Sequence, residues 1–282
     1  MLSRLRRGFT LAEVLISLAL TGMVAGTLHR LLVGTQRITR AQAQRVELQS
    51  NVRAGSLVVL SELRELGAAT GGSGVQNDIL VAGSTALVYR AMRGIGFLCG
   101  TPSATAIRIA RNTFTGHRDP QAGRDSALFF IEDRAAAGEE DIWLGMKILS
   151  VASGPLCPGA LGPAITLTVT SDALVANLPS GTPVRITEVM ELRLYESEGR
   201  SWLGARSVSS GEAIQPVVGP LTRGSGFRLE YLDAAGTPTA DRTSIKSIRI
   251  ALRGTTESDA GNSAPLEEEL TAQVVLRNAV QP

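Results

Sequence analysis

The sequence predicts an α+β fold in which one long N-terminal helix packs on an antiparallel β-sheet head. Three observations lead to this prediction. An apolar run from Phe9 to Leu28 contains Glu13 as its one charged side chain, and a helical pattern continues beyond it to about residue 66. From residue 75 onward, short strand-like segments alternate with turn residues.

A short basic leader, residues 1–8, precedes the apolar run. It ends in Gly8 and carries three arginines, Arg4, Arg6 and Arg7. Because about 20 apolar residues span a bilayer, residues 9–33 are predicted to form a membrane-spanning helix. Basic residues favour a cytoplasmic N-terminus, and long folded domains translocate largely regardless of charge. We therefore expect a single-pass inner-membrane protein with a cytoplasmic N-terminus and a periplasmic, extracytoplasmic head.

Glu13 is the unusual residue of the apolar run. A charge within a membrane helix costs roughly 2.5–3.5 kcal/mol on insertion scales, so it needs a compensating partner. If a protease cut between Gly8 and Phe9, the carboxylate would lie on the same helical face as the new Phe9 amine. In a packed assembly, Glu13 of one subunit could then meet the amine of its neighbour. The alternative is an ordinary signal anchor with Glu13 near the membrane interface.

The segment from Gly8 to Ile16, with the sequence GFTLAEVLI, resembles the processing signal of type IV pilins and type II secretion pseudopilins. The resemblance implies cleavage after Gly8, N-methylation of Phe9 and a role for Glu13 in assembly. It also implies a pilin-like fold. The implied partners are a prepilin peptidase, other major and minor pilins or pseudopilins, and an inner-membrane assembly platform.

Residues 34–67 continue the helix as an amphipathic segment. Its apolar side chains recur at spacings of three, four or seven residues: Ile38, Ala41, Leu48, Val52, Val59, Leu63 and Leu66. Gly67 is a suitable C-terminal stop. A helix over residues 9–66 would be roughly 85 Å long. We expect its first half to be membrane span or filament core and its second half to lie under the head.

Residues 75–282 are predicted to form the β-rich head. The strand-like segments are 86–90, 105–109, 128–131, 165–169, 189–195, 227–231, 245–252 and 270–276. Several alternate apolar and polar residues, as half-buried antiparallel strands do. Glycine-rich breaks near 71–74, 94–104, 153–163 and 254–265 are predicted to be loops.

Cys99 and Cys157 are the two cysteines of the chain. An even pair in an exported region suggests a disulfide, which would stabilise the head by roughly 4 kcal/mol in the chain-entropy model. The alternative is two reduced, buried thiols that pack as small hydrophobic side chains.

Later segments narrow the resemblance. The order of residues 195–203, 216–221 and 245–250 resembles the large minor pilins of the W class and the related J-type minor pseudopilins, and residues 274–278 resemble their C-terminal strand. The resemblance implies a subunit at or near the filament tip that helps start assembly.

The composition of the chain gives little support for nucleic-acid binding, metal binding or catalysis. The net charge is +2 and aromatic residues make up 4% of the chain, too few for a base-stacking platform. Two histidines, His29 and His117, cannot build a zinc or catalytic cluster with such distant cysteines. The acidic run 139–141 lacks the ligand spacing of a calcium loop. We therefore expect no enzyme activity, no cofactor, no metal site and no nucleic-acid partner.

Three functional hypotheses follow. The first is a minor pilin or pseudopilin subunit that a prepilin peptidase processes. The second is a membrane-anchored β-rich adhesin or DNA-uptake module, which a clustered basic or aromatic face would favour. The third is a membrane-tethered hydrolase, which the scarcity of histidine argues against.

Overall fold

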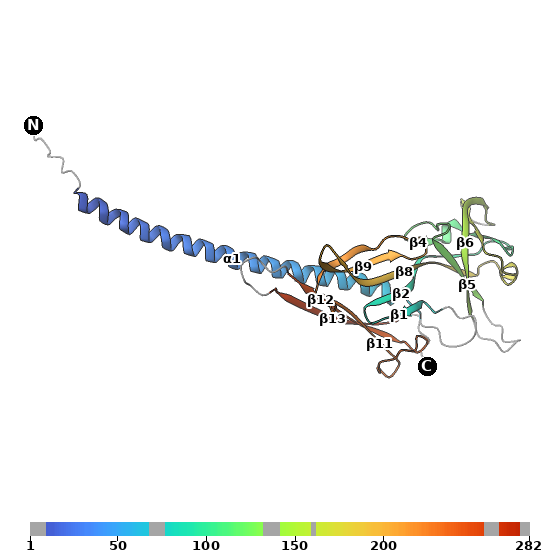
Figure 1. The fold of residues 1–282 in the computed structure, drawn as a ribbon. Helices are drawn as coiled ribbons and strands as arrows, with labels where there is room; N and C mark the ends of the chain where they lie inside the picture. The colour runs from blue at the N-terminus through green and yellow to red at the C-terminus, as the bar shows by residue number, and fades with distance from the viewer. Residues whose placement is uncertain (1–9, 68–76, 132–141, 159–161, 257–264, 277–282) are drawn as a thin grey trace, which may run out of the picture. The chain divides into compact units, whose positions relative to one another are not determined.

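The structure is a computed structural model of the 282-residue chain. It describes residues 10–67, 77–131, 142–158, 162–256 and 265–276 (Figure 1). The chain divides into two compact units, residues 1–48 and residues 49–282.

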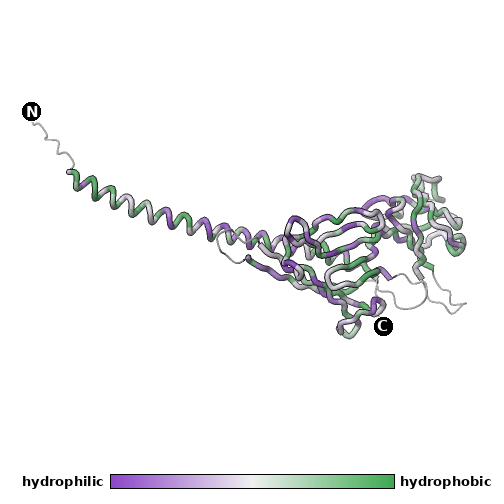
Figure 2. Tube along the Cα trace, in the orientation of Figure 1, coloured by the Kyte–Doolittle hydropathy of each residue, from purple (hydrophilic) through white to green (hydrophobic). Residues whose placement is uncertain are grey.

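Helix α1 (Leu11–Arg64) confirms the long N-terminal helix, within two residues of the predicted ends. The first unit contains its residues 11–48, which are apolar at the N-terminal end and become more polar along the chain (Figure 2). By length and composition α1 can cross a membrane, and the apolar window that meets this criterion has none of its surface buried. The exposure of so many leucines and valines is consistent with a lipid or protein environment rather than water.

The second unit is the β-rich head, and its strands pair antiparallel. The strands are β1 (Ile79–Ala82), β2 (Ala86–Phe97), β3 (Ala106–Ile109), β4 (Thr115–Gly116), β5 (Asp125–Ile131), β6 (Ile142–Leu156), β7 (Pro163–Val169), β8 (Pro183–Ser197), β9 (Arg200–Ser207), β10 (Gln215–Leu221), β11 (Phe227–Leu232), β12 (Ser247–Thr255) and β13 (Glu267–Val275). Two short 3-10 helices, η1 (Arg111–Thr113) and η3 (Val175–Asn177), lie between strands. Together with α1 this is the predicted α+β class.

The main path of the sheet runs β11-β12-β10-β9-β8-β5-β6-β7-β3. β8 is its central strand: one edge pairs with β2, and the other pairs with β9 along one half and with β5 along the other. β13 pairs with β12. The long reach of β8 therefore joins the two ends of the head.

The C-terminal turns of α1 belong to the head and bury the predicted apolar stripe. Val52, Val59 and Leu63 are each at most 1% exposed. The helix comes very close to β10 at Gly55, where an added Cβ would lie 2.2 Å from a methyl carbon of Val218. Glycine is needed at this position because any side chain would overlap that methyl group.

A second hydrophobic cluster fills the other end of the head, where strands β3, β5, β6, β7 and β8 meet. Its largest fully buried members include Phe129, Ile107, Ile148 and Leu167. The predicted alternation of β7 is visible here, since Ile165, Leu167 and Val169 point into this cluster. These strands therefore form a core separate from the helix-covered part of the sheet.

Two predicted loops are partly wrong. Residues 94–97 continue β2, and residues 153–156 continue β6, which runs to Leu156. The glycines of β2 are accommodated because neighbouring side chains occupy the space above them: a Cβ on Gly94 would lie 2.6 Å from the Phe114 ring, and one on Gly96 would lie 2.5 Å from Ile109. Close packing, rather than a turn, explains these glycines.

Cys99 and Cys157 are joined by a disulfide with a Cα–Cα distance of 5.7 Å. This is the pairing predicted for an exported head, and the alternative of two free thiols does not apply to this structure. Ala110 and Ala164 pack beside the bridge. The bridge ties the segment after β2 to the segment after β6.

Candidate assembly site at the start of α1

Thr10 and Glu13 form a reciprocal hydrogen-bonded pair where α1 begins. The backbone N–H and the hydroxyl of Thr10 each donate to Oε2 of Glu13 at 3.0 Å. In return, the backbone N–H of Glu13 donates to Oγ1 of Thr10 at 3.3 Å. This geometry is a capping box, which satisfies backbone donors that a helix start otherwise leaves unpaired.

The capping box explains why the helix starts at this point. Thr10 supplies the N-cap oxygen, Glu13 supplies the carboxylate three residues later, and the backbone oxygen of Thr10 accepts from Val14 at 3.3 Å. A negative charge in the first turn is also favourable for the helix dipole. The signature Thr-x-x-Glu stands in the sequence, whereas the prediction for Glu13 concerns only an intermolecular partner.

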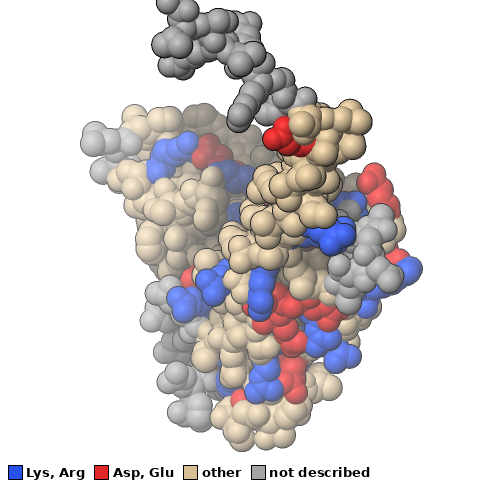
Figure 3. All heavy atoms as spheres, turned by 90° about the vertical axis from the view of Figure 1, so that its left-hand side faces the viewer, with Lys and Arg blue, Asp and Glu red and all other residues tan. Residues whose placement is uncertain are grey.

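The surroundings of Glu13 are apolar and uncovered. The neighbouring side chains that are at least 57% exposed are Leu11, Leu15, Ile16, Leu18 and Leu20. Figure 3 looks toward the N-terminal end of the chain and shows mostly uncharged atoms over the helix. Glu13 itself is exposed and is the one charged residue between Thr10 and Leu28. A carboxylate in such a position is costly in a membrane unless hydrogen bonds or a cation offset its desolvation.

The Thr10–Glu13 pair leaves the carboxylate of Glu13 able to accept further hydrogen bonds. Oε2 of Glu13 takes both bonds from Thr10, and no hydrogen bond within the described part of the chain uses Oε1. An ionised carboxylate offers about four lone-pair sites, so an amine can bind without displacing Thr10. Charge-assisted bonds of this kind are roughly twice as strong as neutral ones. The site therefore suits recognition of a cation by a capped carboxylate.

Gly8 and Phe9, the predicted cleavage and methylation residues, lie outside the described residues. Their roles, and the assembly role of Glu13, remain predictions. His29 lies in α1 within the first unit, and His117 follows β4 within the second. The acidic run 139–141 also lies outside the described residues.

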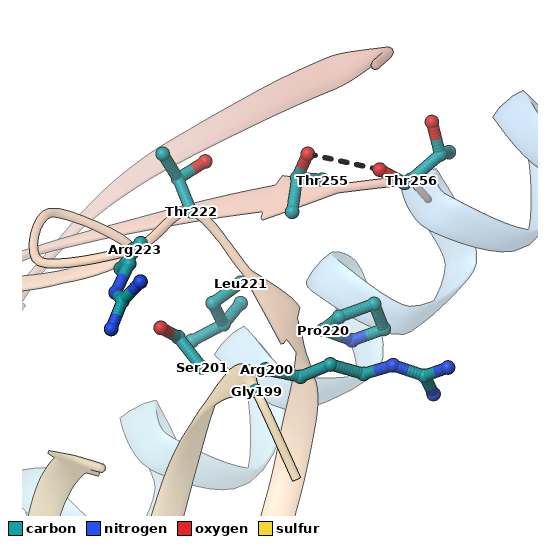
Figure 4. Close-up of a pocket in the computed structure, with 9 residues that line it drawn as sticks. All are labelled: Gly199, Arg200, Ser201, Pro220, Leu221, Thr222, Arg223, Thr255 and Thr256. Carbon is teal, nitrogen blue, oxygen red and sulfur yellow. Dashed lines mark hydrogen bonds between the residues drawn. The ribbon is translucent and has the colours of Figure 1, made fainter. Parts of the chain in front are cut away.

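The head contains a pocket of about 300 Å³ at the junction of β9, β10 and β12 (Figure 4). Arg200 and Arg223 are among its lining residues, but their side chains point in opposite directions. Arg223 is engaged by two hydrogen bonds of 2.7 Å to Glu196. Polar groups that diverge in this way do not form a ligand site.

No group of three or more His, Cys, Asp or Glu side chains that could hold a metal ion is present among the described residues. The charged residues of the head instead pair with one another. Glu188, for example, accepts from Arg93 at 2.7 Å.

Comparison with known proteins agrees with the motif at the start of the chain. A family model described as the prokaryotic N-terminal methylation motif matches residues 3–28. The pilin-like protein PilA3 of Thermus thermophilus is 38% identical over 74 residues, which cover 26% of this chain and 32% of that protein. The chain thus aligns with just under a third of the length of that relative. No solved structure matches the chain.

The fold and the site define a class: proteins anchored by one apolar N-terminal helix with a β-rich head. Within that class, the methylation motif and the partial match to PilA3 support assignment of this chain to the type IV pilin-like family. The N-terminal hydrophobic helix and the motif fit membrane anchoring with pilus assembly.

Proposed function

We propose that the chain is a minor pilin or pseudopilin subunit, cleaved by a prepilin peptidase between Gly8 and Phe9 and assembled into a type IV pilus or type II secretion pseudopilus. One observation carries the proposal: Glu13 is a lone carboxylate on an exposed apolar helix, held by Thr10 with accepting capacity to spare. Cleavage before Phe9 would generate an amine four residues before Glu13, on the same face of the helix as the carboxylate.

The pairing would operate between subunits. In a single straight helix, residues 9 and 13 lie one turn apart along the axis, and Thr10 already donates to Oε2 of Glu13. A neighbouring helix displaced along the filament axis can bring its own amine to the second oxygen. Burial of both charges would then be offset, and the register between neighbouring subunits would be set.

The remaining features of the proposal concern place and partners. The helix would anchor the chain in the inner membrane with its N-terminus in the cytoplasm and its head outside. Its partners would be the peptidase, other pilins or pseudopilins and an assembly platform in the membrane. The size of the head and the order of residues 195–203, 216–221 and 245–250 support the proposal of a minor, non-catalytic subunit that helps start assembly at or near the tip.

The decisive experiment compares Glu13→Ala with Thr10→Ala in cells that assemble the filament. Glu13→Ala is expected to be cleaved normally, with a mature N-terminus at Phe9 by mass spectrometry, and to be lost from sheared filaments. Thr10→Ala removes the helix cap, at a cost of about 1 kcal/mol, but keeps the carboxylate, so incorporation should persist. Wild-type incorporation of Glu13→Ala, or a mature chain that retains residues 1–8, contradicts the proposal.

A further inference from the structure

β13 is an edge strand of the head. It forms nine consecutive pairs with β12, from Thr255 opposite Glu267 to Ser247 opposite Val275, without a register shift. Within the described part of the chain, no other strand pairs with it. A long edge with no bulge offers its backbone groups to another strand.

The hydrogen-bond pattern shows which residues of β13 face outward. The N–H of Thr256 donates to the oxygen of Leu266 at 2.9 Å, and the N–H of Leu276 donates to the oxygen of Lys246 at 2.9 Å. In an antiparallel ladder such pairs recur at every second residue, so the even-numbered residues of β13 bond to β12. The odd-numbered residues direct their N–H and C=O groups away from β12: Glu267, Glu269, Thr271, Gln273 and Val275.

Among the described residues, no loop or turn forms a backbone hydrogen bond with these five outward-facing residues. Their side chains are all exposed, and Val275 is 63% exposed. Residues 267–275 contain no proline and no lysine, and the charged side chains are confined to the first three residues, so residues 270–275 carry no such edge protection. The unpaired row therefore has the form of a strand acceptor.

Charge along the edge is asymmetric. Three consecutive glutamates begin β13, whereas residues 270–275 are uncharged. Glu269 is paired with Arg253, and Glu267 and Glu268 accept hydrogen bonds from the uncharged side chains of Thr222 and Gln49. Three carboxylates and one guanidinium leave the local charge negative. A strand that adds here is favoured if it carries cations opposite the glutamates and β-branched residues opposite Gln273 and Val275.

We propose that β13 accepts an extended strand of another protein chain, running antiparallel to it, with Lys or Arg at the C-terminal end of the added strand. Antiparallel addition continues the pairing found between β12 and β13 and joins the odd-numbered residues in closely hydrogen-bonded pairs. The cations of the added strand then lie opposite Glu269 and Glu267. This binding mode goes beyond filament assembly and does not depend on Glu13.

The test uses the full chain in detergent and a synthetic nine-residue peptide that matches the length of β13. The peptide Val-Val-Thr-Val-Thr-Val-Lys-Thr-Lys places its two lysines opposite Glu269 and Glu267. Binding is expected by fluorescence anisotropy of the labelled peptide, and it should weaken in high salt. A peptide with both lysines replaced by glutamate is expected to bind with an affinity at least about tenfold lower.

Proline substitutions in β13 distinguish loss of peptide binding from loss of folding. Thr271→Pro removes an outward N–H that β12 does not use, so the head should stay folded while peptide affinity falls about tenfold or more. Thr271→Ala keeps the N–H and is expected to bind within about twofold of the unaltered chain. Ala272→Pro removes an N–H bonded to β12 and should lower the melting temperature.

Three results overturn the inference. They are no binding of the lysine peptide by the unaltered chain, equal binding by a folded Thr271→Pro variant, and equal binding of the lysine and glutamate peptides. Because Glu13→Ala should bind the peptide normally, failure here is distinguishable from failure of the proposed assembly function.

Discussion

Gly67 and Asp78 exchange two hydrogen bonds where α1 meets the sheet. The backbone N–H of Gly67 donates to Oδ2 of Asp78 at 2.8 Å, and the backbone N–H of Asp78 donates to the oxygen of Gly67 at 3.0 Å. Asp78 is 2% exposed, and Arg185 lies 3.5 Å from the same carboxylate oxygen. The pair fixes the C-terminal end of the helix against the start of β1.

Substitution of Asp78 by alanine is expected to destabilise the head. The change leaves the buried N–H of Gly67 without its acceptor, and an unsatisfied buried donor costs about 1–3 kcal/mol. Asp78→Asn keeps an acceptor oxygen and should cost less. Chemical denaturation measures both. The control is Asp119→Ala, because its partner Arg111 and Asp119 itself are both about half exposed, and such surface pairs contribute at most about 1 kcal/mol. Equal losses for Asp78→Ala and Asp119→Ala would contradict the assignment.

The acid stability of the head is expected to depend on Glu188. Burial alone would raise the pKa of this carboxyl, but hydrogen bonds from Ser207, Arg93 and Arg124 lower the pKa from 4.5 to about 2. A lowered pKa contributes stability that is present above the unfolded-state pKa and is lost as pH falls toward the folded-state value. Glu188 should therefore contribute about 3 kcal/mol near neutral pH, lost between about pH 5 and pH 2.

The measurement is the free energy of unfolding as a function of pH for the unaltered chain and Glu188→Gln. The difference between the two should shrink as pH falls through that window. Asp78 has the opposite sign: burial raises its pKa above 3.8, so its contribution to stability falls as pH rises through that shift. Asn cannot ionise, so the free energy of unfolding of Asp78→Asn relative to the unaltered chain should rise as pH rises through the folded-state pKa of Asp78. A constant difference between Glu188→Gln and the unaltered chain from neutral pH down to pH 2 would refute this assignment.

Removal of the disulfide is expected to destabilise the head without changing the assembly site. Cys99 and Cys157 are 58 residues apart, and closing a loop of that length stabilises by roughly 4 kcal/mol in the chain-entropy model. The melting temperature of the head should fall on reduction with dithiothreitol and in the double variant Cys99→Ser, Cys157→Ser. The double variant should no longer respond to dithiothreitol. An unaltered melting temperature on full reduction would show that the bridge is not a stabilising element.

Gly55 and Val218 are expected to show energetic coupling. A Cβ at residue 55 would overlap Val218, so Gly55→Ala should destabilise by about 1–3 kcal/mol in the unaltered chain. With Val218→Ala in place both methyl overlaps are removed and a tight 3.0 Å contact with the Cβ of residue 218 remains, so Gly55→Ala should destabilise the head clearly less than it does in the unaltered chain. A double-mutant cycle in denaturant measures the coupling. Gly34→Ala, where no atom lies within 4 Å, is the uncoupled control, and additivity at Gly55 and Val218 would refute the contact.

Much of the strand pattern was readable from the sequence, and the missed parts have identifiable causes. Residues 227–231 and 245–252 alternate clearly because one face of β11 and β12 is buried and the other is solvated. β6 and β10 were missed because the glycines and prolines within them are typical of turns, although both strands pair antiparallel with their neighbours through register shifts. Local composition cannot distinguish a glycine in a turn from one placed under an aromatic ring.

The long helix, its apolar first half and the lone carboxylate Glu13 were all predictable from the residue pattern, because they depend on residues close together along the chain. The class of fold followed from the change from helical to alternating periodicity. The Thr10–Glu13 cap is local and has a Thr-x-x-Glu signature in the sequence. The closure of the helix end on Gly67 by Asp78 and the open edge at β13 emerge only in the tertiary structure. Those relationships depend on hydrogen-bond direction and on contacts between distant segments, which a pattern of residue types does not encode.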